Sequence, residues 1–195
     1  VLDRVDLQLA ADEAVVSPAD GHTIQLRDIT ARIPNIEQDS VLTIQGQTFA
    51  PAESYLALAH HSPLRRLLDG FLDPATAQGD WSVPLRLTLP LLNVDDTKVQ
   101  GAVHFAGGTV SLDPDAPAFE QVSGTLEFSE TGFSADGLKA QFLGDTAQFS
   151  GGIGGGRKGL ELKGRLTAEA LRSYVGVQGM ERLKGGLAYQ ASLRR

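Results

Sequence analysis

Residues 81–89 read Trp-Ser-Val-Pro-Leu-Arg-Leu-Thr-Leu, and this stretch decides the fold class. Its apolar and polar residues alternate with a period of two, which is typical of a β-strand with one apolar and one polar face. Pro84 has no backbone N–H to give to a neighbouring strand, so we expect this strand to lie at a sheet edge or to leave that position unpaired. Similar alternation predicts eight or more strands, at Ile24/Leu26, Leu42/Ile44, Val99/Val103/Phe105, Val122/Leu126/Phe128, Leu138/Ala140/Phe142, Leu160/Leu162/Leu166 and Leu187/Tyr189.

Turn-forming residues separate these strands at intervals of about ten residues. They are Gly107-Gly108, Asp113-Pro114-Asp115, Thr131-Gly132, Gly144-Asp145 and a glycine-rich run over 151–156, which we expect to be a flexible hairpin loop. Such short spacing favours successive antiparallel strands over parallel strands joined by helices. The expected fold class is therefore mainly β.

Two stretches break the alternation with apolar residues three and four apart. Over 52–61 and 63–72 this spacing predicts a short helical hairpin, at about 52–72. Ser62-Pro63 is suited to begin its second helix. A third short helix is expected over 167–175, with Thr167 as its N-cap.

One unit of the sequence repeats. Val99-Gln-Gly-Ala-Val-His-Phe105 aligns with Val122-Ser-Gly-Thr-Leu-Glu-Phe128 at an offset of 23 residues. A glycine inside a strand leaves a gap on the apolar face and permits a bulge or bend. Glycines at matching positions of neighbouring strands would let the sheet curve along one line. A curved sheet with an apolar inside is either a closed core or a groove.

Composition excludes several classes of protein. The chain has 195 residues, a formal net charge of −7 and no cysteine. This length suffices to bury a core in one domain or two small ones. Because an acidic chain without a Lys/Arg cluster lacks the basic surface that binds phosphate backbones, we expect no nucleic acid among the partners. Without cysteine there is no disulfide framework, zinc–thiolate site or thiol nucleophile.

The termini indicate a segment of a longer protein. The chain begins at Val1, inside a pattern that already alternates, and stops just after another one. No stretch approaches the roughly 20 apolar residues of a membrane-spanning helix, so we expect any anchor or signal to lie outside the segment. We treat 1–195 as a single segment, with strands plus the helical hairpin in 1–78 and repeated β-hairpin modules in 79–195.

Candidates for catalysis or metal binding are few. The adjacent His60 and His61 end a predicted helix and point about 100° apart, so they are better suited to a helix C-terminus than to sharing one metal. His104 falls on the polar phase of its strand, which favours a solvated position. The Gly154–Gly159 run fits a dinucleotide motif, but a strand pattern follows it where the motif needs a helix.

Carboxylates give no clear catalytic pattern either. Asp113 and Asp115 flank a proline and lack the oxygen-donor spacing of a dedicated calcium loop, so turn formation is the better interpretation. No Gly-x-Ser-x-Gly nucleophile elbow is present. We therefore expect no enzyme, no catalytic residue, no metal site and no cofactor.

Longer strings in the sequence are similar to a known family. Residues 122–144 resemble a recurring module of the YhdP branch of the AsmA-like proteins. So do Ser62-Pro63-Leu64 after a short helix, the strand end Leu87-Thr-Leu-Pro-Leu91 and then Lys98-Val-Gln-Gly-Ala-Val-His-Phe105. Order and spacing match as well as the individual strings, over most of the chain.

The resemblance implies a fold, a place and a function. Proteins of this family are large, anchored in the inner membrane of diderm bacteria by an N-terminal helix, and extend across the periplasm as a curved, taco-like β-sheet. Its inner apolar groove is thought to carry phospholipid towards the outer membrane. The implied partners are phospholipid acyl chains, flanking modules of the same chain and proteins of the inner and outer membranes.

The apolar phase of the strands supplies the candidate groove residues. A groove lined by them could shield acyl chains from water at about 25 cal/mol per Å² covered. They are Val83, Leu85, Leu87, Leu89, Val103, Phe105, Leu126, Phe128, Phe142, Leu160 and Leu162. A bulge at Arg27-Asp28, or at any glycine, would flip the face assignment beyond it.

Besides the lipid-conducting groove, two other functions remain open at the level of sequence. The same residues could pack together in a closed sandwich, and the protein would then be a structural or assembly factor of the cell envelope without lipid conduction. A periplasmic hydrolase or carbohydrate-binding module would need convergent polar groups, of which the sequence gives no sign. Trp81 lies in the alternating apolar series, which favours packing over a sugar platform.

Overall fold

The computed structural model describes residues 5–34, 40–61, 65, 70, 72–175 and 185–193. Within them the chain forms mostly strands, with two short helices and one 3₁₀ turn. In chain order the elements are β1 (Leu7–Ala19), β2 (His22–Ile33), β3 (Val41–Pro51), α1 (Ala52–His60), β4 (Thr76–Gln78), β5 (Asp80–Pro90), η1 (Val94–Asp96), β6 (Lys98–Ala106), β7 (Thr109–Ser111), β8 (Phe119–Ser129), β9 (Gly132–Ser134), β10 (Lys139–Phe142), β11 (Asp145–Gly154), β12 (Arg157–Thr167), α3 (Ala168–Val175) and β13 (Gly186–Leu193).

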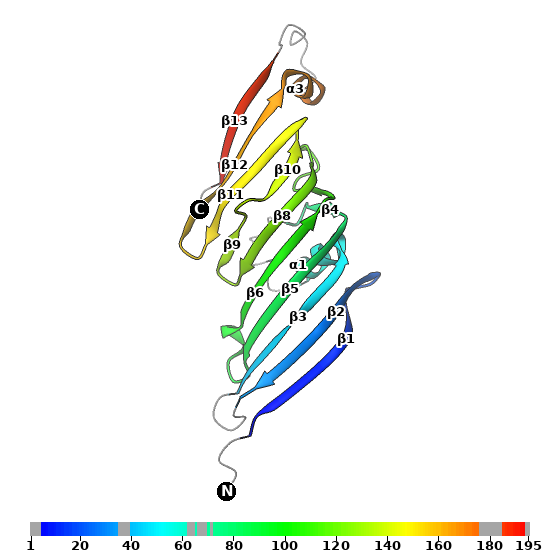
Figure 1. Ribbon diagram of the computed structural model, residues 1–195, viewed down its shortest axis with the longest axis vertical. Coiled ribbons are helices and arrows are strands. Elements are labelled where there is room, and N and C mark those ends of the chain that lie inside the picture. The colour runs from blue at the N-terminus through cyan, green and yellow to red at the C-terminus, as the bar shows by residue number, and fades with distance from the viewer. Residues whose placement is uncertain are drawn as a thin grey trace.

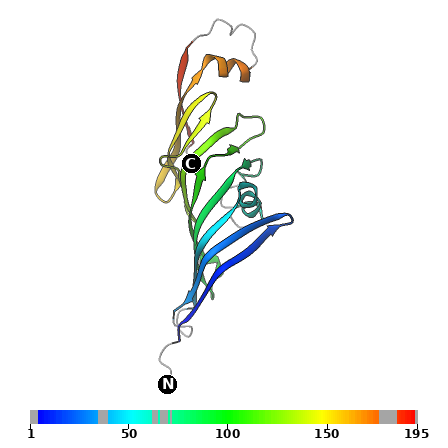
Figure 2. The same cartoon turned by 45° about the vertical axis from the view of Figure 1, so that its right-hand side comes forward.

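The strands form one antiparallel sheet whose spatial order follows the sequence. The path runs β1-β2-β3-β5-β6-β8-β10-β11-β12-β13, so strands stack one after another along the long axis of the molecule (Figure 1). β9 and β10 share the place between β8 and β11, and β4 and β7 pair with each other beside β8. The sheet is curved and open, as the family resemblance implied, and its two outermost strands are β1 and β13 (Figure 2).

Register fixes which side chains share a face. Residues paired across antiparallel strands point to the same side, and residues two apart along a strand do so as well. By this rule Ala50 on β3 and Phe105 on β6 lie on the same side of the sheet as Trp81. Applied from strand to strand, the rule places the apolar phase of every strand on the path on that side. We call this side the apolar face. The other side, the polar face, carries Arg86, Gln100 and the other polar-phase residues.

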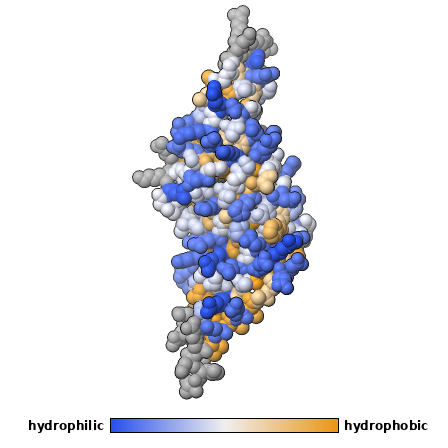
Figure 3. All heavy atoms as spheres, in the orientation of Figure 1, coloured by the Kyte–Doolittle hydropathy of each residue, from blue (hydrophilic) through white to orange (hydrophobic). Residues whose placement is uncertain are grey.

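The polar face is visible in a space-filling view. Figure 3 is mostly blue and white over the middle of the sheet, with orange concentrated towards the margins. α1 lies on the opposite side, where it packs on Trp81. The helix therefore sits on the inner, apolar face of the curved sheet.

A bulge is present in the second strand, at a position where, judged from the sequence, a bulge would flip the face assignment. The register between β2 and β3 shifts between Arg27 and Thr30, and Asp28 takes a positive φ of 52°. As a result Leu26 and Ile29 both lie on the apolar face, although they are three residues apart. The bulge thus changes the apolar phase within β2.

Pro84 occupies a central strand, so its placement at a sheet edge was wrong. β5 lies between β3 and β6 and pairs with β3 along its whole length, Pro84 opposite Gln47. The ladder to β6 is interrupted between Ser82 and Leu85. The second expectation, an unpaired position, is the one that fits, because proline cannot donate to that ladder.

The glycine-rich run is not the loop that was expected. Residues 151–154 belong to β11, and only Gly155 and Gly156 form the turn to β12. Gly152 lies opposite Ser134 of β9, and a Cβ there would overlap the carbonyl oxygen of Phe133. Glycine is needed because two backbones cross at close range.

The helices agree with the sequence wherever they are described. α1 covers the first arm of the predicted hairpin, whereas most of the second arm lies outside the described residues. α3 begins one residue after Thr167, whose Oγ1 accepts a hydrogen bond of 3.1 Å from the backbone N–H of Ala170. Thr167 is therefore the N-cap, as predicted.

The core is thin. Two small buried clusters lie on the apolar face, one of Ala52, Ala77 and Trp81, the other around Val122 and Leu138. Among the described residues, no large side chain is fully buried. This is expected for a single sheet that carries short helices rather than a second sheet.

Candidate functional site

All eleven predicted groove residues lie on the apolar face. The register places them on the same side of five strands of one sheet, within the part from β5 to β12. They are Val83, Leu85, Leu87 and Leu89 on β5, Val103 and Phe105 on β6, Leu126 and Phe128 on β8, Phe142 on β10, and Leu160 and Leu162 on β12. Their contact with lipid stays a prediction.

These residues differ in how they are packed. Val83 is buried, at 4% exposure, while the other ten are half-buried. Val103, Phe105, Leu126 and Leu160 pack against the two buried clusters. The remaining leucines on β5 lie outside both clusters. The apolar face therefore has a packed part and a more open part.

Sequence reasoning missed several residues of this face. Ile44 of β3 and Val99 of β6 both lie opposite Leu87, one on each neighbouring strand. Phe133 lies opposite Phe128. Ile44 and Val99 had shown the apolar phase in the sequence and could have been included. Phe133 belongs to the three-residue strand β9, which is too short to show a period.

α1 is held on the apolar face by a chain of hydroxyl groups. The Tyr55 hydroxyl donates to Thr48 Oγ1 at 2.8 Å, and Thr48 Oγ1 donates to the Val83 carbonyl oxygen at 2.8 Å. The Tyr55 ring stacks on Trp81, with centroids 6.0 Å apart. Burial raises the pKa of Tyr55, partly offset by the bond to Thr48, so the hydroxyl stays protonated and available as a donor.

A second aromatic group lies near α3. Phe119 stacks on Phe142 with centroids 4.7 Å apart, and Phe149 and Tyr189 continue the group at 5.2 and 6.1 Å. Burial, and then the charge of Asp145, raise the pKa of Tyr189. The strand ends near α1 and α3, which we call the helix end of the apolar face, are thus filled by aromatic rings.

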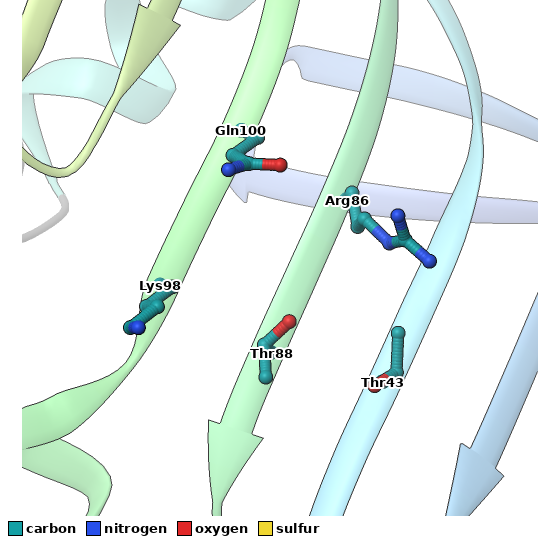
Figure 4. Close-up of a pocket in the computed structure, with 5 residues that line it drawn as sticks. All are labelled: Thr43, Arg86, Thr88, Lys98 and Gln100. Atoms are coloured by element: carbon teal, nitrogen blue, oxygen red, sulfur yellow. The ribbon is translucent and has the colours of Figure 1, made fainter.

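The polar face has two shallow hollows. One, of about 160 Å³, is lined by Thr43, Arg86, Thr88, Lys98 and Gln100, whose side chains stand on β3, β5 and β6 (Figure 4). The other, of about 360 Å³, lies where β8 and β9 meet β11 and includes Glu127 and Arg157. The first hollow is lined by polar-face residues alone, whereas Phe128 and Phe133 of the apolar face also line the second.

Two of the four histidines lie beside backbone carbonyl oxygens at the end of α1. His60 Nε2 lies 2.9 Å from the Leu72 carbonyl oxygen, and His61 Nδ1 lies 2.8 Å from that of Ala57, both at the end of α1. His104 is exposed on the polar face beside Thr125. In the part of the chain that the structure describes, no three His, Cys, Asp or Glu side chains gather as metal ligands would.

One carboxylate fastens two hairpins together. Asp136 accepts hydrogen bonds from the Gly151 backbone N–H at 2.6 Å and from Arg157 at 2.7 Å. These bonds, that of Gly151 first, hold the pKa of Asp136 below its ordinary value. The contact joins the β9–β10 connection to β11 and β12, so it stabilises the sheet rather than forming a reactive site.

The fold and the site together define the class to which this protein belongs. Its strands form a long, single-layer antiparallel sheet that is curved around an apolar inner face and polar on its outer face. A family model described as YhdP protein matches residues 14–194, and the chain belongs to this family. The match confirms the resemblance seen in the sequence. Neither the curated proteins nor the solved structures gave a match.

Within the described ranges, neither helix has the length and apolar character that crossing a bilayer requires.

Proposed function

We propose that this chain is an interior segment of a periplasmic β-groove protein that supports phospholipid transport between the inner and outer membranes and outer-membrane homeostasis. In this proposal the whole protein is anchored in the inner membrane of a diderm bacterium. Its partners are phospholipid acyl chains, the flanking modules of the same chain and proteins of both membranes. The segment needs no catalytic residue for this task.

One observation carries the proposal. The apolar phase can be followed from β1 to β13, with Asp145 and Lys158 as charged positions on it, and most of its large side chains remain half-buried or exposed. A soluble protein rarely leaves so large an apolar surface without a ligand or partner to cover it. Acyl chains suit such a surface because each CH₂ group withdrawn from water contributes about 0.8 kcal/mol. Membership of the YhdP family supports the same function.

A second function is favoured by a different observation. At the helix end, α1 and the aromatic groups already cover part of the apolar face. If further contacts covered the rest, the segment would be a structural or assembly factor of the envelope with a closed β core. Lipid would then have no place on the sheet.

The test is lipid extraction followed by native mass spectrometry. The protein is purified from a bacterial periplasm together with its flanking modules, beside the variant Phe105→Asp/Phe128→Asp. We expect phospholipid to co-purify with the parent protein and to be lost from the variant, because an unpaired carboxylate at position 128 would face the acyl chains and would have to lose its water.

The matched control is His104→Asp/Thr125→Asp, which places two carboxylates at neighbouring positions of the polar face. This variant is expected to keep its lipid. Circular dichroism of all three proteins separates loss of lipid from loss of fold. A parent protein that is well folded and free of lipid would contradict transport and favour the assembly function.

A further inference from the structure

The apolar face has an end opposite to the helices. Here β5 turns into β6 through η1, β8 turns into β9, and β11 turns into β12. We call it the hairpin end. In Figure 1 it lies along the lower left of the sheet, while α1 and α3 lie towards the other side.

A row of paired apolar residues crosses five strands at the hairpin end. Each member lies directly opposite the next across one ladder, from the outermost strand β1 to β6. The row is Leu9, Ala31, Ile44, Leu87 and Val99. Leu9 is 59% exposed and the other four are half-buried, so the row is accessible along its length.

A second row, two residues away from the first along β5, extends as far as β11 and ends there, because Lys158 of β12 lies opposite Ile153. It begins beside Ile44 and runs from β3 to β11 through β9, again by direct pairing at every step. The row is Gly46, Leu85, Gly101, Phe128, Phe133 and Ile153. Neither row contains a charged or polar side chain.

The helix end differs in its packing. Trp81 is 8% exposed and lies between the Tyr55 and Phe105 rings, the latter 5.0 Å away. Ala52 of α1 is completely buried, and its N–H bonds the Gly79 carbonyl oxygen at 2.8 Å. Protein side chains thus already occupy the space above the sheet where an acyl chain would otherwise lie.

We propose, on the basis of the lipid-transport function above, that the acyl chains of a phospholipid lie along these two rows at the hairpin end, and that the helix end is a packed support which lipid does not enter. Because the rows cross the strands, they run along the direction in which strands are stacked, which is the long axis of the molecule. From β1 to β11 an acyl chain on these rows meets only apolar side chains and glycines, so moving it from strand to strand over this part of the sheet requires no desolvation of a polar group.

The lone tryptophan gives a direct test. Trp81 lies in the helix end, and Leu87, six residues along β5, lies in the first row about 20 Å away. Bromine atoms on acyl chains quench tryptophan emission on contact. The 195-residue chain is mixed with vesicles of phosphatidylethanolamine and phosphatidylglycerol that carry brominated acyl chains. The variants Trp81→Phe/Leu87→Trp and Trp81→Phe/Thr88→Trp are treated in the same way.

We expect emission to be lost for the tryptophan at position 87 and kept for Trp81 in the parent chain. Thr88 is the neighbour of Leu87 on the polar face, so a tryptophan there is expected to keep its emission as well. Leu87→Trp with Trp81 retained is a second variant, in case the replacement of Trp81 disturbs the fold. Its loss of emission relative to the parent reports position 87.

Two failures are distinguishable. If lipid binds but Trp81 is quenched as much as the tryptophan at 87, or if only Trp81 is quenched, the acyl chains enter the helix end and the inference is wrong while lipid binding stands. If no brominated lipid remains with the protein after the vesicles are removed, the proposed transport function itself is contradicted.

Discussion

Single glycines shape the apolar face by making room for aromatic rings. Gly101 lies opposite Phe128, and Gly164 lies opposite Tyr189. A Cβ at Gly101 would lie 2.5 Å from Phe128 Cζ, and one at Gly164 would lie 2.5 Å from the Tyr189 hydroxyl oxygen. The ring in each pair therefore lies across its glycine, which is the arrangement that compensates for a missing side chain in a strand.

Gly101→Ala is expected to destabilise the fold by about 1–3 kcal/mol, because the added methyl group forces the Phe128 ring to move. Urea unfolding measures the loss. Adding Phe128→Ala removes the clash, so the double variant should lose less than the sum of the two single losses.

Gly186→Ala is the matched control. Gly186 also sits in a strand with an ordinary φ, but the nearest atom to its Cβ would be 3.6 Å away. The change in its free energy of unfolding should stay within about 0.5 kcal/mol. Equal losses at the two glycines would show that the Phe128 ring plays no part.

The Asp136 contact gives a pH-dependent prediction. Its pKa in the folded chain lies below the ordinary value of 3.8, so its stabilisation is complete above about pH 4 and is lost as pH falls through the lowered value. The melting temperature of the parent should therefore exceed that of Asp136→Asn at pH 7. This difference should shrink towards zero at low pH.

Arg157→Gln separates the two main bonds of Asp136. It removes the charged partner and keeps the bond from Gly151, which contributes more to the lowered pKa. Its effect on the melting temperature at pH 7 should accordingly be smaller than that of Asp136→Asn. A difference between parent and Asp136→Asn that stays constant from pH 7 to pH 2 would contradict this account.

The position of α1 depends on the side chain of Tyr55. Pro51 precedes it and no side chain caps its first turn, so its position depends on the bonds of Tyr55 and on packing against Trp81. Tyr55→Phe should cost about 1 kcal/mol of unfolding free energy. Amide hydrogen exchange in α1 should speed up more than in β5.

Tyr174→Phe is the comparison for that variant. The Tyr174 hydroxyl donates to the Asp115 carbonyl oxygen at 2.7 Å, but the residue is 50% exposed and water can replace the bond. Loss of the Tyr174 hydroxyl should lower the free energy of unfolding by less than loss of the Tyr55 hydroxyl does. Equal hydrogen exchange in α1 for Tyr55→Phe and the parent would show that packing alone holds the helix.

At the scale of elements the sequence was informative where segments were long. The alternation over 81–89 predicted β5, and the spacing of apolar residues predicted α1 and α3. Strands of three residues such as β4, β7 and β9 were missed, because a period of two cannot be seen in three positions. The glycine run was assigned to a loop because the close approach of β9, which requires those glycines, is a tertiary contact.

The sequence predicted which residues lie on the apolar face but not how deeply each of them is buried. Alternation placed all eleven predicted residues on one face, because the side chains of a strand point to only two faces. It could not show that Phe105 packs under α1 while Leu87 stays outside the buried clusters, because this depends on where the helix lies. Nor could it decide between one sheet and a sandwich, which have the same alternation.

The whole molecule ends in two unpaired edge strands. β1 and β13 each have a neighbour on one side only among the described strands, and an open edge is a template for another chain. We expect the isolated 195-residue chain to associate as its concentration rises, measured by analytical ultracentrifugation. Val15→Lys, at a residue of β1 that is 65% exposed, should weaken the association.

Leu92→Lys distinguishes pairing of strand edges from non-specific hydrophobic association. Leu92 is 88% exposed and lies between β5 and η1, away from both edges. Its replacement should leave the association unchanged. A monodisperse monomer for the parent chain at every concentration would show that the edges do not pair.

The order of the strands also bears on how the chain acquires its structure. Since spatial order follows sequence order, almost every ladder joins segments that are close along the chain, and few long loops must close before a contact forms. A polypeptide delivered N-terminus first can therefore add each strand to the edge left by the one before it. Folding of this kind is vectorial: it needs no C-terminal residue to be present before the first hairpins form.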